Sequence, residues 1–382
     1  MVELGTLIQQ AKTVRCGNGD YPVLSMTMHD GLVFQDDKFK KIIASKDRSD
    51  YKVVKRNQLV ISFPIDEGVL AAQRIVDAGI VSPAYGIWNI DQERILPEFL
   101  EYALRCGRAL SYYTANLRGS TARRRSLPKP VLLAYTVPLP SISEQRFILD
   151  VIRKSKQIID DRSKQLQKLD ELVKARFIEL FGMPGADDFG WGLTPLGSIC
   201  YINPKKGQDH RLGSGVEVSF VPMSAVTEYG KIDATAVKEY DEVKTGFTYF
   251  AENDVLFAKI TPCMENGKGA VARGLHNGLG FGSTEFHVLR PISGRSNPYW
   301  IYTLTAFSQF REDAASNMTG SAGQRRVPAS FLENYCVAVP PIELQQQFAA
   351  FVEQVDKSKV AVQKALDEAQ LLFDSLMQKY FG

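Results

Sequence analysis

Residues 135–182 read YTVPLPSISEQRFILDVIRKSKQIIDDRSKQLQKLDELVKARFIELFG, and residues 335–382 read YCVAVPPIELQQQFAAFVEQVDKSKVAVQKALDEAQLLFDSLMQKYFG. After a Pro-x-Ile signal, both stretches contain no glycine or proline until the Phe-Gly on which they end. Apolar residues then recur at alternating steps of four and three, a 3.5-residue period that is typical of a coiled coil. The predicted seam contains Ile148, Ile152, Ile159, Leu166, Leu169 and Val173 in the first stretch, and Val352, Val355, Val362, Leu366 and Phe373 in the second.

Each predicted helix would be about 55 Å long at 1.5 Å per residue, too long to be hidden inside a domain of this chain. We therefore expect the two helices to pair with each other. Because each follows its own globular domain, a pseudo-twofold arrangement would make the pair antiparallel. Polar residues interrupt the seam at Ser155, Arg162, Arg176 and Lys359, where they could fix the register or face a partner protein.

The two helical stretches are the ends of a larger internal repeat, at a shift of roughly 200 residues. Equivalent pairs of segments run through both halves in one order. They include Leu4–Leu7 with Leu196–Ile199, Asn57–Ser62 with Asn253–Ala258, Ser82–Ile87 with Ser283–Val288, and the helix starts at Pro97 and Pro298. The period is a whole domain, so the chain is a duplication.

Composition agrees with two globular domains. The chain has 382 residues, is 45% hydrophobic and 23% charged, and has no apolar stretch long enough for a membrane span. The N-terminus lacks a secretory signal, so we expect a cytoplasmic protein. Five cysteines without a C-x-x-C pair argue against a zinc site, and the net charge of +3 does not by itself indicate nucleic-acid binding.

The predicted fold class is α+β, with two similar domains of mixed sheets and helices separated by two long helices that form an antiparallel coiled coil. The expected boundaries are a first domain at 1–142, a helix at 143–182, a linker at 183–194, a second domain at 195–342 and a helix at 343–382.

This organisation resembles the specificity (S) subunit of type I restriction-modification systems. The resemblance rests on Val137-Pro138-Leu139-Pro140 with Glu144-Gln145, on Leu169–Leu172, and on the Phe177–Gly182 ending, in a pattern that occurs twice. The second copy departs from the first at Ala338 and Leu344, so we expect its helix to start differently in detail.

The resemblance implies that each globular unit is a target recognition domain that reads one half of a split, asymmetric DNA site. It also implies that the helices set the unread distance between the halves. The partners would be double-stranded DNA and two methyltransferase (modification) subunits, and whether restriction or translocase subunits join them is left open. These partners would bind the methyl donor, magnesium and ATP, so no cofactor or metal is expected on this chain.

Loops rich in arginine, lysine and small hydroxyl residues are candidate DNA contacts, because their donors suit phosphates and guanine edges. A solvated surface loop would have the same composition. The candidates are Ser120, Arg123, Arg124, Arg125 and Lys129 in the first domain, and Lys205, Lys206, Lys259, Ser321, Gln324, Arg325 and Arg326 in the second.

Motifs for catalysis are missing from the sequence. Asn297-Pro298-Tyr299-Trp300 lacks one proline of the N-P-P-Y/F motif of amino-methyltransferases, and the proline is better explained as a helix start. The four histidines have no ligand spacing, and there is no phosphate-binding P-loop. We therefore expect a non-catalytic subunit. A free-standing DNA-binding or scaffolding protein, and a methyltransferase or nuclease, remain the alternatives.

Overall fold

The computed structural model describes residues 1–28, 30–38, 48–118, 127–206, 210–321 and 323–382. Residue contacts divide the chain into two compact units, Met1–Arg162 with Ala365–Gly382, and Ser163–Lys364. Each long helix is therefore shared between the units, because its two ends pack on different globular cores. The sequence-based boundaries had instead given each helix a segment of its own.

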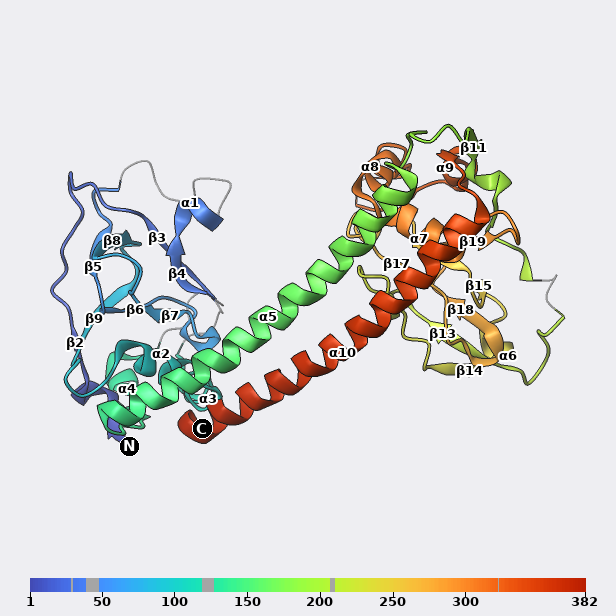
Figure 1. Cartoon of the computed structure of the whole chain (residues 1–382). Helices are drawn as coiled ribbons and strands as arrows, with labels where there is room; N and C mark the ends of the chain where they lie inside the picture. Colours follow the sequence, from blue (N-terminus) through green and yellow to red (C-terminus); the bar gives the residue numbers. More distant parts are fainter. Residues whose placement is uncertain (29, 39–47, 119–126, 207–209, 322) are drawn as a thin grey trace. The chain divides into compact units, whose positions relative to one another are not determined.

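The first unit is built on a four-stranded sheet with the strand order β2–β9–β6–β7 (Figure 1). Its strands are β2 (Ile8–Gln10), β6 (Leu59–Ile61), β7 (Leu70–Ala72) and β9 (Gly86–Ile90), and neighbours in the sheet are antiparallel. Three two-stranded pairs complete the described strands: β1 (Val2–Glu3) with β10 (Thr136–Val137), β3 (Leu24–Thr27) with β4 (Gly31–Phe34), and β5 (Lys52–Lys55) with β8 (Ala78–Val81).

The second unit repeats this plan with the strand order β12–β19–β16–β17. These strands are β12 (Cys200–Ile202), β16 (Val255–Ala258), β17 (Gly269–Val271) and β19 (Phe286–Pro291), and β11 (Leu193–Pro195) pairs with β20 (Cys336–Ala338). A second four-stranded sheet has the order β14–β13–β18–β15, from β13 (Glu217–Val221), β14 (Val237–Glu239), β15 (Thr248–Ala251) and β18 (Leu279–Gly282). The β13–β18 pair is parallel, so this sheet is mixed, as the fold class predicted.

The central strand β16 shows why a continuous apolar run in the sequence predicted a strand. All of its residues are buried, because it pairs with β17 on one side and β19 on the other. A strand that is covered in this way has a continuous apolar run rather than alternation. The linker predicted to end at 194 was too long, because Leu193 and Thr194 already belong to β11 and pair with Ala338 and Val337.

The helices also correspond between the units. In the first unit they are α1 (Gln35–Lys38), α2 (Pro97–Arg105), α3 (Gly107–Asn116) and α4 (Lys129–Ala134), and in the second α6 (Tyr240–Val243), α7 (Pro298–Ala306), α8 (Ser308–Ser316) and α9 (Ala329–Asn334). Both α2 and α7 begin with proline, whose missing N–H costs nothing at that position. The long helices are α5 (Ile142–Phe181) and α10 (Ile342–Phe381).

The two long helices start differently, as the departure at Leu344 predicted. At α5, Ser141 and Glu144 form a reciprocal capping box, with the Ser141 backbone N donating to Glu144 Oε2 at 2.8 Å and the Glu144 N to Ser141 Oγ at 3.3 Å. The Ser141 hydroxyl also donates to Glu144 Oε2 at 2.6 Å, and this bond, together with the one from the Ser141 backbone, lowers the pKa of Glu144. At α10 the equivalent positions are Pro341 and Leu344, which cannot make these bonds.

A buried glutamine then attaches each helix to its globular domain. Gln145 Nε2 donates to the carbonyl oxygens of Arg94 and Pro140, both at 2.9 Å, and its Oε1 accepts from the Leu96 N at 2.8 Å. Gln345 makes the equivalent set, to Arg295 O at 3.1 Å, Pro340 O at 2.9 Å and from Asn297 N at 2.9 Å. Both side chains are fully buried. The glutamines therefore fix each helix to the loop that precedes α2 or α7.

The Phe-Gly ending of each helix packs on the α2 or α7 helix of the unit it enters. The ring of Phe381, at the end of α10, has its centroid 4.9 Å from that of Phe99 on α2, and the Phe381 carbonyl oxygen accepts from Arg108 Nε at 3.2 Å. Phe181, at the end of α5, packs against Trp300 on α7 with ring centroids 6.5 Å apart. Both phenylalanines are almost completely buried.

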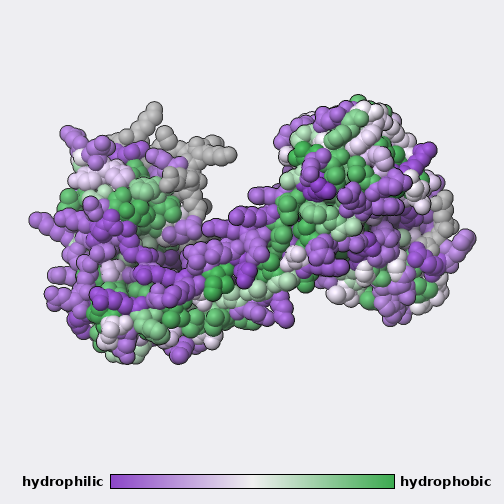
Figure 2. Space-filling model, in the orientation of Figure 1, coloured by the Kyte–Doolittle hydropathy of each residue, from purple (hydrophilic) through white to green (hydrophobic). Residues whose placement is uncertain are grey.

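The seam residues lie on the covered side of the helices. Among them Ile148, Ile152, Val173, Val352, Val355 and Val362 are buried, and Ile159, Leu166, Leu169, Leu366 and Phe373 are half-buried. Polar side chains cover much of the visible face, with apolar groups between them (Figure 2). Within the described part of the chain, none of the helices has the length and apolar character needed to cross a membrane.

Candidate nucleic-acid interface

Three separate stretches of the second unit meet at the surface that carries the predicted basic residues. Residues 259–261 pair through their backbone with 325–327, since Thr261 N donates to Arg325 O at 3.0 Å and Val327 N to Lys259 O at 2.9 Å. Lys259 N in turn donates to Glu285 O at 2.9 Å. We call residues 259–261, 283–287, 319–321 and 323–327 together the Arg326 surface.

Arg326 is a cation of this surface that a carboxylate side chain holds. Its Nε donates to Glu285 Oε2 at 2.9 Å and its Nη2 donates to Glu285 Oε1 at 2.8 Å. The carboxylate thus accepts two hydrogen bonds along one edge of the guanidinium. Its Nη1 donates to Gln324 O at 3.2 Å. The Arg326 hydrogen bonds lower the pKa of Glu285, which keeps this carboxylate charged. The Arg326 side chain is still 41% exposed.

Arg325 has a mainly structural contact. Its Nη2 donates to the carbonyl oxygens of Ala315 at 2.9 Å and Met318 at 3.2 Å, at the end of α8. Ala315 lies in the last turn of α8, where a cation is favourable, and Met318 follows the end of the helix. Of the two predicted arginines, only Arg326 therefore presents a guanidinium that is held by a side chain.

The other predicted residues of the second unit lie in a turn of this surface and in the segment after β12. Ser321 and Gln324 are exposed in one turn, where Gln324 N donates to Ser321 O at 3.0 Å. Lys205 is exposed, and Lys206 Nζ donates to the carbonyl oxygen of Lys244. The Lys205 segment follows Asn203, which contacts His287 of the Arg326 surface.

Sequence reasoning missed Glu285, His287 and Asn203. His287 Nε2 lies 2.8 Å from Val327 O, and Asn203 Nδ2 lies 3.0 Å from His287 Nδ1. Burial lowers the pKa of His287, and the nearby Lys259 lowers it further. The neutral imidazole thus links the Asn203 segment to the backbone beside Arg326. A weak signal existed, because His287 lies in the strand that the repeat had aligned with Ser82–Ile87.

Fewer of the candidates in the first unit can be placed. Ser120, Arg123, Arg124 and Arg125 lie outside the residues that the structure describes. Lys129 begins α4 and is exposed, with Nζ donating to Gln10 Oε1 at 2.6 Å and lying 5.3 Å from the ring centroid of Trp88. The predicted DNA contacts of this unit stay predictions.

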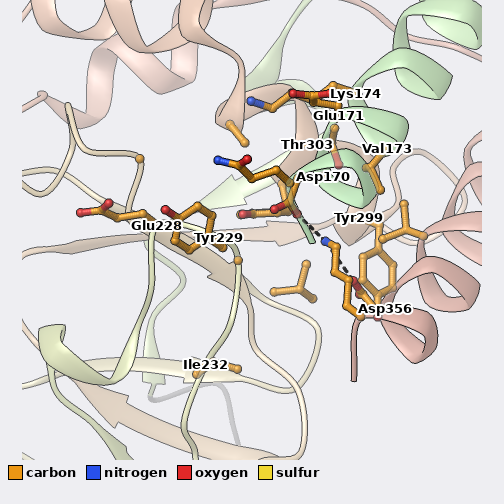
Figure 3. Close-up of a pocket in the computed structure, with 18 of the residues that line it drawn as sticks. Asp170, Glu171, Val173, Lys174, Glu228, Tyr229, Ile232, Tyr299, Thr303 and Asp356 are labelled. Carbon is orange, nitrogen blue, oxygen red and sulfur yellow. Dashed lines mark ion pairs between the residues drawn. The ribbon is translucent and has the colours of Figure 1, made fainter. Parts of the chain in front are cut away.

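The second unit also has a cavity of about 500 Å³ that is lined by α5, α7, α10 and the loop at 228–232 (Figure 3). Lys359 Nζ pairs there with Asp170 at 2.6 Å and with Asp356 at 3.5 Å. The positive charge of Lys359, which interrupts the predicted seam, is therefore neutralised by carboxylates from both helices. Across the described ranges, no group of His, Cys, Asp or Glu side chains could hold a metal ion.

Comparisons with known proteins point to one family. Residues 190–369 match the family described as the type I restriction modification DNA specificity domain. The specificity subunit of the type I restriction enzyme EcoAI from Escherichia coli is 37% identical over 195 residues, and that of EcoEI is 38% identical over the same length. In both cases the match covers 49% of this chain and 32% of the relative, so this chain spans about a third of the length of these relatives.

Solved structures show the same fold over the whole chain. A type I restriction-modification S subunit from M. genitalium has a TM-score of 0.52 at 15% identity, and the alignment covers 100% of this chain and 95% of that one. A chain from a study of complex assembly and conformational transition in a type I R-M system has a TM-score of 0.55 at 18% identity, covering 100% and 96%. Residues 190–369 therefore match the type I restriction modification DNA specificity domain, and the chain's resemblance to type I specificity subunits is confirmed.

Proposed function

We propose that this chain is the DNA-recognition subunit of a type I restriction-modification complex, and that it directs adenine methylation and restriction by partner subunits. The observation that carries the proposal is the match of residues 190–369 to the DNA specificity domain. The EcoAI and EcoEI relatives are specificity subunits by name. The proposed recognition site is bipartite and asymmetric, with one half read by each unit.

The fold of the first unit supports a recognition role for it as well. Its sheet order β2–β9–β6–β7 equals the order β12–β19–β16–β17 of the second unit, and both units have the same buried glutamine at the helix start. Two copies of one fold with different surface loops are suited to reading two different short sequences. This agreement supports a recognition role for the first unit, which lies outside the matched range.

The proposed partners are two modification subunits, with a restriction or translocase subunit as a further candidate. Leu172 on α5 and Leu372 on α10 occupy equivalent positions of the repeat, and they are 46% and 53% exposed. Equivalent exposed leucines on both helices would give two copies of one partner the same contact. The methyl donor, magnesium and ATP would be bound by these partners, and the chain itself would be non-catalytic and work in the cytoplasm, where the DNA is.

Two other functions make different predictions. A free-standing DNA-binding or scaffolding protein would bind its site tightly without a methyltransferase. An enzyme would methylate or cleave DNA on its own. Incubating the purified chain with a labelled methyl donor and DNA tests the enzyme, and co-purification with a methyltransferase tests the free-standing protein.

The decisive experiment maps methylated adenines in a host that lacks its own system and expresses this chain with its modification subunits. We expect methylation at one split sequence, and none when this chain is omitted. Replacing residues 1–142 by the matching domain of a relative should then change one half of the site and leave the other intact. Methylation that does not depend on this chain, or a swap that alters both halves, would contradict the proposal.

A further inference from the structure

The strand β19 and the turn before it differ between the two units in a way that concerns recognition. The repeat aligns Ser82–Ile87 with Ser283–Val288, so Glu285 stands where the first unit has Ala84, and His287 where it has Gly86. The surrounding sheet order is the same in both. Polar side chains that one copy has at this place, and the other lacks, are candidates for the function in which the copies differ.

Glu285 holds the Arg326 guanidinium in a fixed plane. The carboxylate accepts from Nε and Nη2 on one edge, and Gln324 O accepts from Nη1. A guanidinium has two N–H groups on each Nη, so these contacts leave one on Nη1 and one on Nη2. The exposed side chain can therefore donate to a further acceptor without breaking its contact with Glu285.

The backbone beside Arg326 is held from two sides. Arg326 N donates to Thr319 O at 2.8 Å, and Thr319 N to Arg326 O at 3.0 Å. On the other side, His287 Nε2 lies 2.8 Å from Val327 O. Because a carbonyl oxygen can only accept, Nε2 carries the proton and Nδ1 is the acceptor.

Asn203 fixes that tautomer. Val288 N donates to Asn203 Oδ1 at 3.0 Å, which leaves the Asn203 Nδ2 as donor to His287 Nδ1 at 3.0 Å. His287 is 5% exposed, so DNA cannot reach it directly. His287 and Asn203 therefore act as positioning residues, through the backbone of Val327.

We infer that Arg326 is a specificity-determining residue of the second unit, held by Glu285 and His287 so that it donates to the O6 and N7 acceptors of a guanine in the major groove. This inference rests on the proposed function, because it names how one half of the proposed site is read. Arginine bound to guanine through two N–H groups is the commonest specific contact between proteins and DNA bases.

The Glu285 contact favours a base edge over a phosphate. A phosphate contact depends mainly on positive charge, and the adjacent carboxylate offsets the charge of Arg326. By contrast, the two acceptors on a guanine edge lie in one plane, and to bind both of them the guanidinium must be held in a fixed orientation. The ammonium group of lysine is not planar and cannot make this contact. The carboxylate therefore costs phosphate affinity and improves base selection.

The test uses the full chain with its modification subunits and maps methylated sites genome-wide for R326K, R326A and E285Q. A matched control is E242Q, which removes the carboxylate of an exposed pair with Lys238 in the same unit. We expect R326K and R326A to lose discrimination at one base pair of one half-site by about ten- to a hundred-fold, since a two-bond contact contributes roughly 1–3 kcal/mol. E285Q should relax the same position less, and E242Q should leave the site unchanged.

Several outcomes separate the proposals. Lower methylation at every site with unchanged base preference would mean a phosphate contact, and an unchanged site would mean that Arg326 does not touch DNA. Either result overturns this inference. Retained reading of the other half-site and co-purification with the modification subunits show that a variant is folded, and E285Q decides the question if both Arg326 variants fail to fold. Absence of methylation by the unaltered complex would instead contradict the proposed function.

Discussion

Replacement of Gln345 by alanine should destabilise the second unit strongly, although the side chain takes part in no proposed DNA contact. The Gln345 amide makes three hydrogen bonds, to Arg295 O and Pro340 O and from Asn297 N, and it is fully buried. Each such bond contributes about 1 kcal/mol net, and each buried group left without a partner costs about 1–3 kcal/mol. We expect a loss of about 3 kcal/mol in the free energy of unfolding.

For a unit of this size, 1 kcal/mol shifts the melting temperature by about 2–4 °C, so Q345A should lower the Tm of the second unit by about 6–12 °C. Hydrogen exchange can localise the effect, because the amide of Asn297 loses its acceptor. The matched control is Gln309→Ala, which removes an exposed glutamine whose side chain donates to Asp313 Oδ1 at 3.1 Å. A Q345A protein no less stable than Q309A, with unchanged exchange at Asn297, would refute the reasoning.

Three further predictions follow from other parts of the chain. Neutralising the arginines at 123–125 should weaken DNA binding and flatten its salt dependence, since each phosphate contact contributes about 0.9 to the log–log slope; an unchanged slope would mean that they face solvent. Burial lowers the pKa of His287 from 6.5, and Lys259 lowers it further, while the hydrogen bond to Val327 O and the charge of Glu285 raise it; because the net direction is down, the unfolded state binds more protons below pH 6.5. The stability of the second unit should therefore fall as the pH drops below 6.5, and H287Q should reduce this fall in melts between pH 5 and 8. Phe381→Ala should lower the free energy of unfolding of the first unit by about 3–5 kcal/mol, measured by denaturant titration, because a buried aromatic ring is removed.

Much of the fold was predictable because its signals are local. The long apolar period of the helices, their Pro-x-Ile starts and the proline at the first position of α2 and α7 can all be read within a few turns of chain. The repeat added long-range information, since two similar halves imply one fold. The sequence also marked Gln145 and Gln345 as repeated residues, but not that they are buried and bonded to the loop before α2 and α7.

The site was less predictable because its members come from distant stretches. Asn203, Glu285 and Arg326 come together only when the segments next to β12 and β19 and the residues 323–327 are folded together. Charge alone ranked Arg325 and Arg326 equally, yet Arg325 caps α8 while Arg326 is held by a carboxylate. The amino-acid composition of a loop cannot predict that a carboxylate from a distant stretch will lie beside one of its arginines.

The last prediction concerns the length of the two helices. Inserting one in-register heptad into each, near Leu166 and Leu366, keeps the 3.5-residue seam in phase. The helices then lengthen by about 10 Å, since each residue adds 1.5 Å. Duplex DNA rises about 3.4 Å per base pair, so an unread spacer set by the helices should grow by roughly three pairs.

Three base pairs also rotate one half-site by about a third of a turn around the duplex, and this strain should lower affinity even where the spacing is right. We expect methylation to move to sites with the longer spacer while both half-site sequences stay the same. The control is a variant with the inserts placed at the same points but four residues long, which breaks the phase of the seam and should reduce stability. A stable heptad variant that still methylates sites with the original spacer would show that the helices do not set the distance between the half-sites. The modification subunits would then have to set that distance.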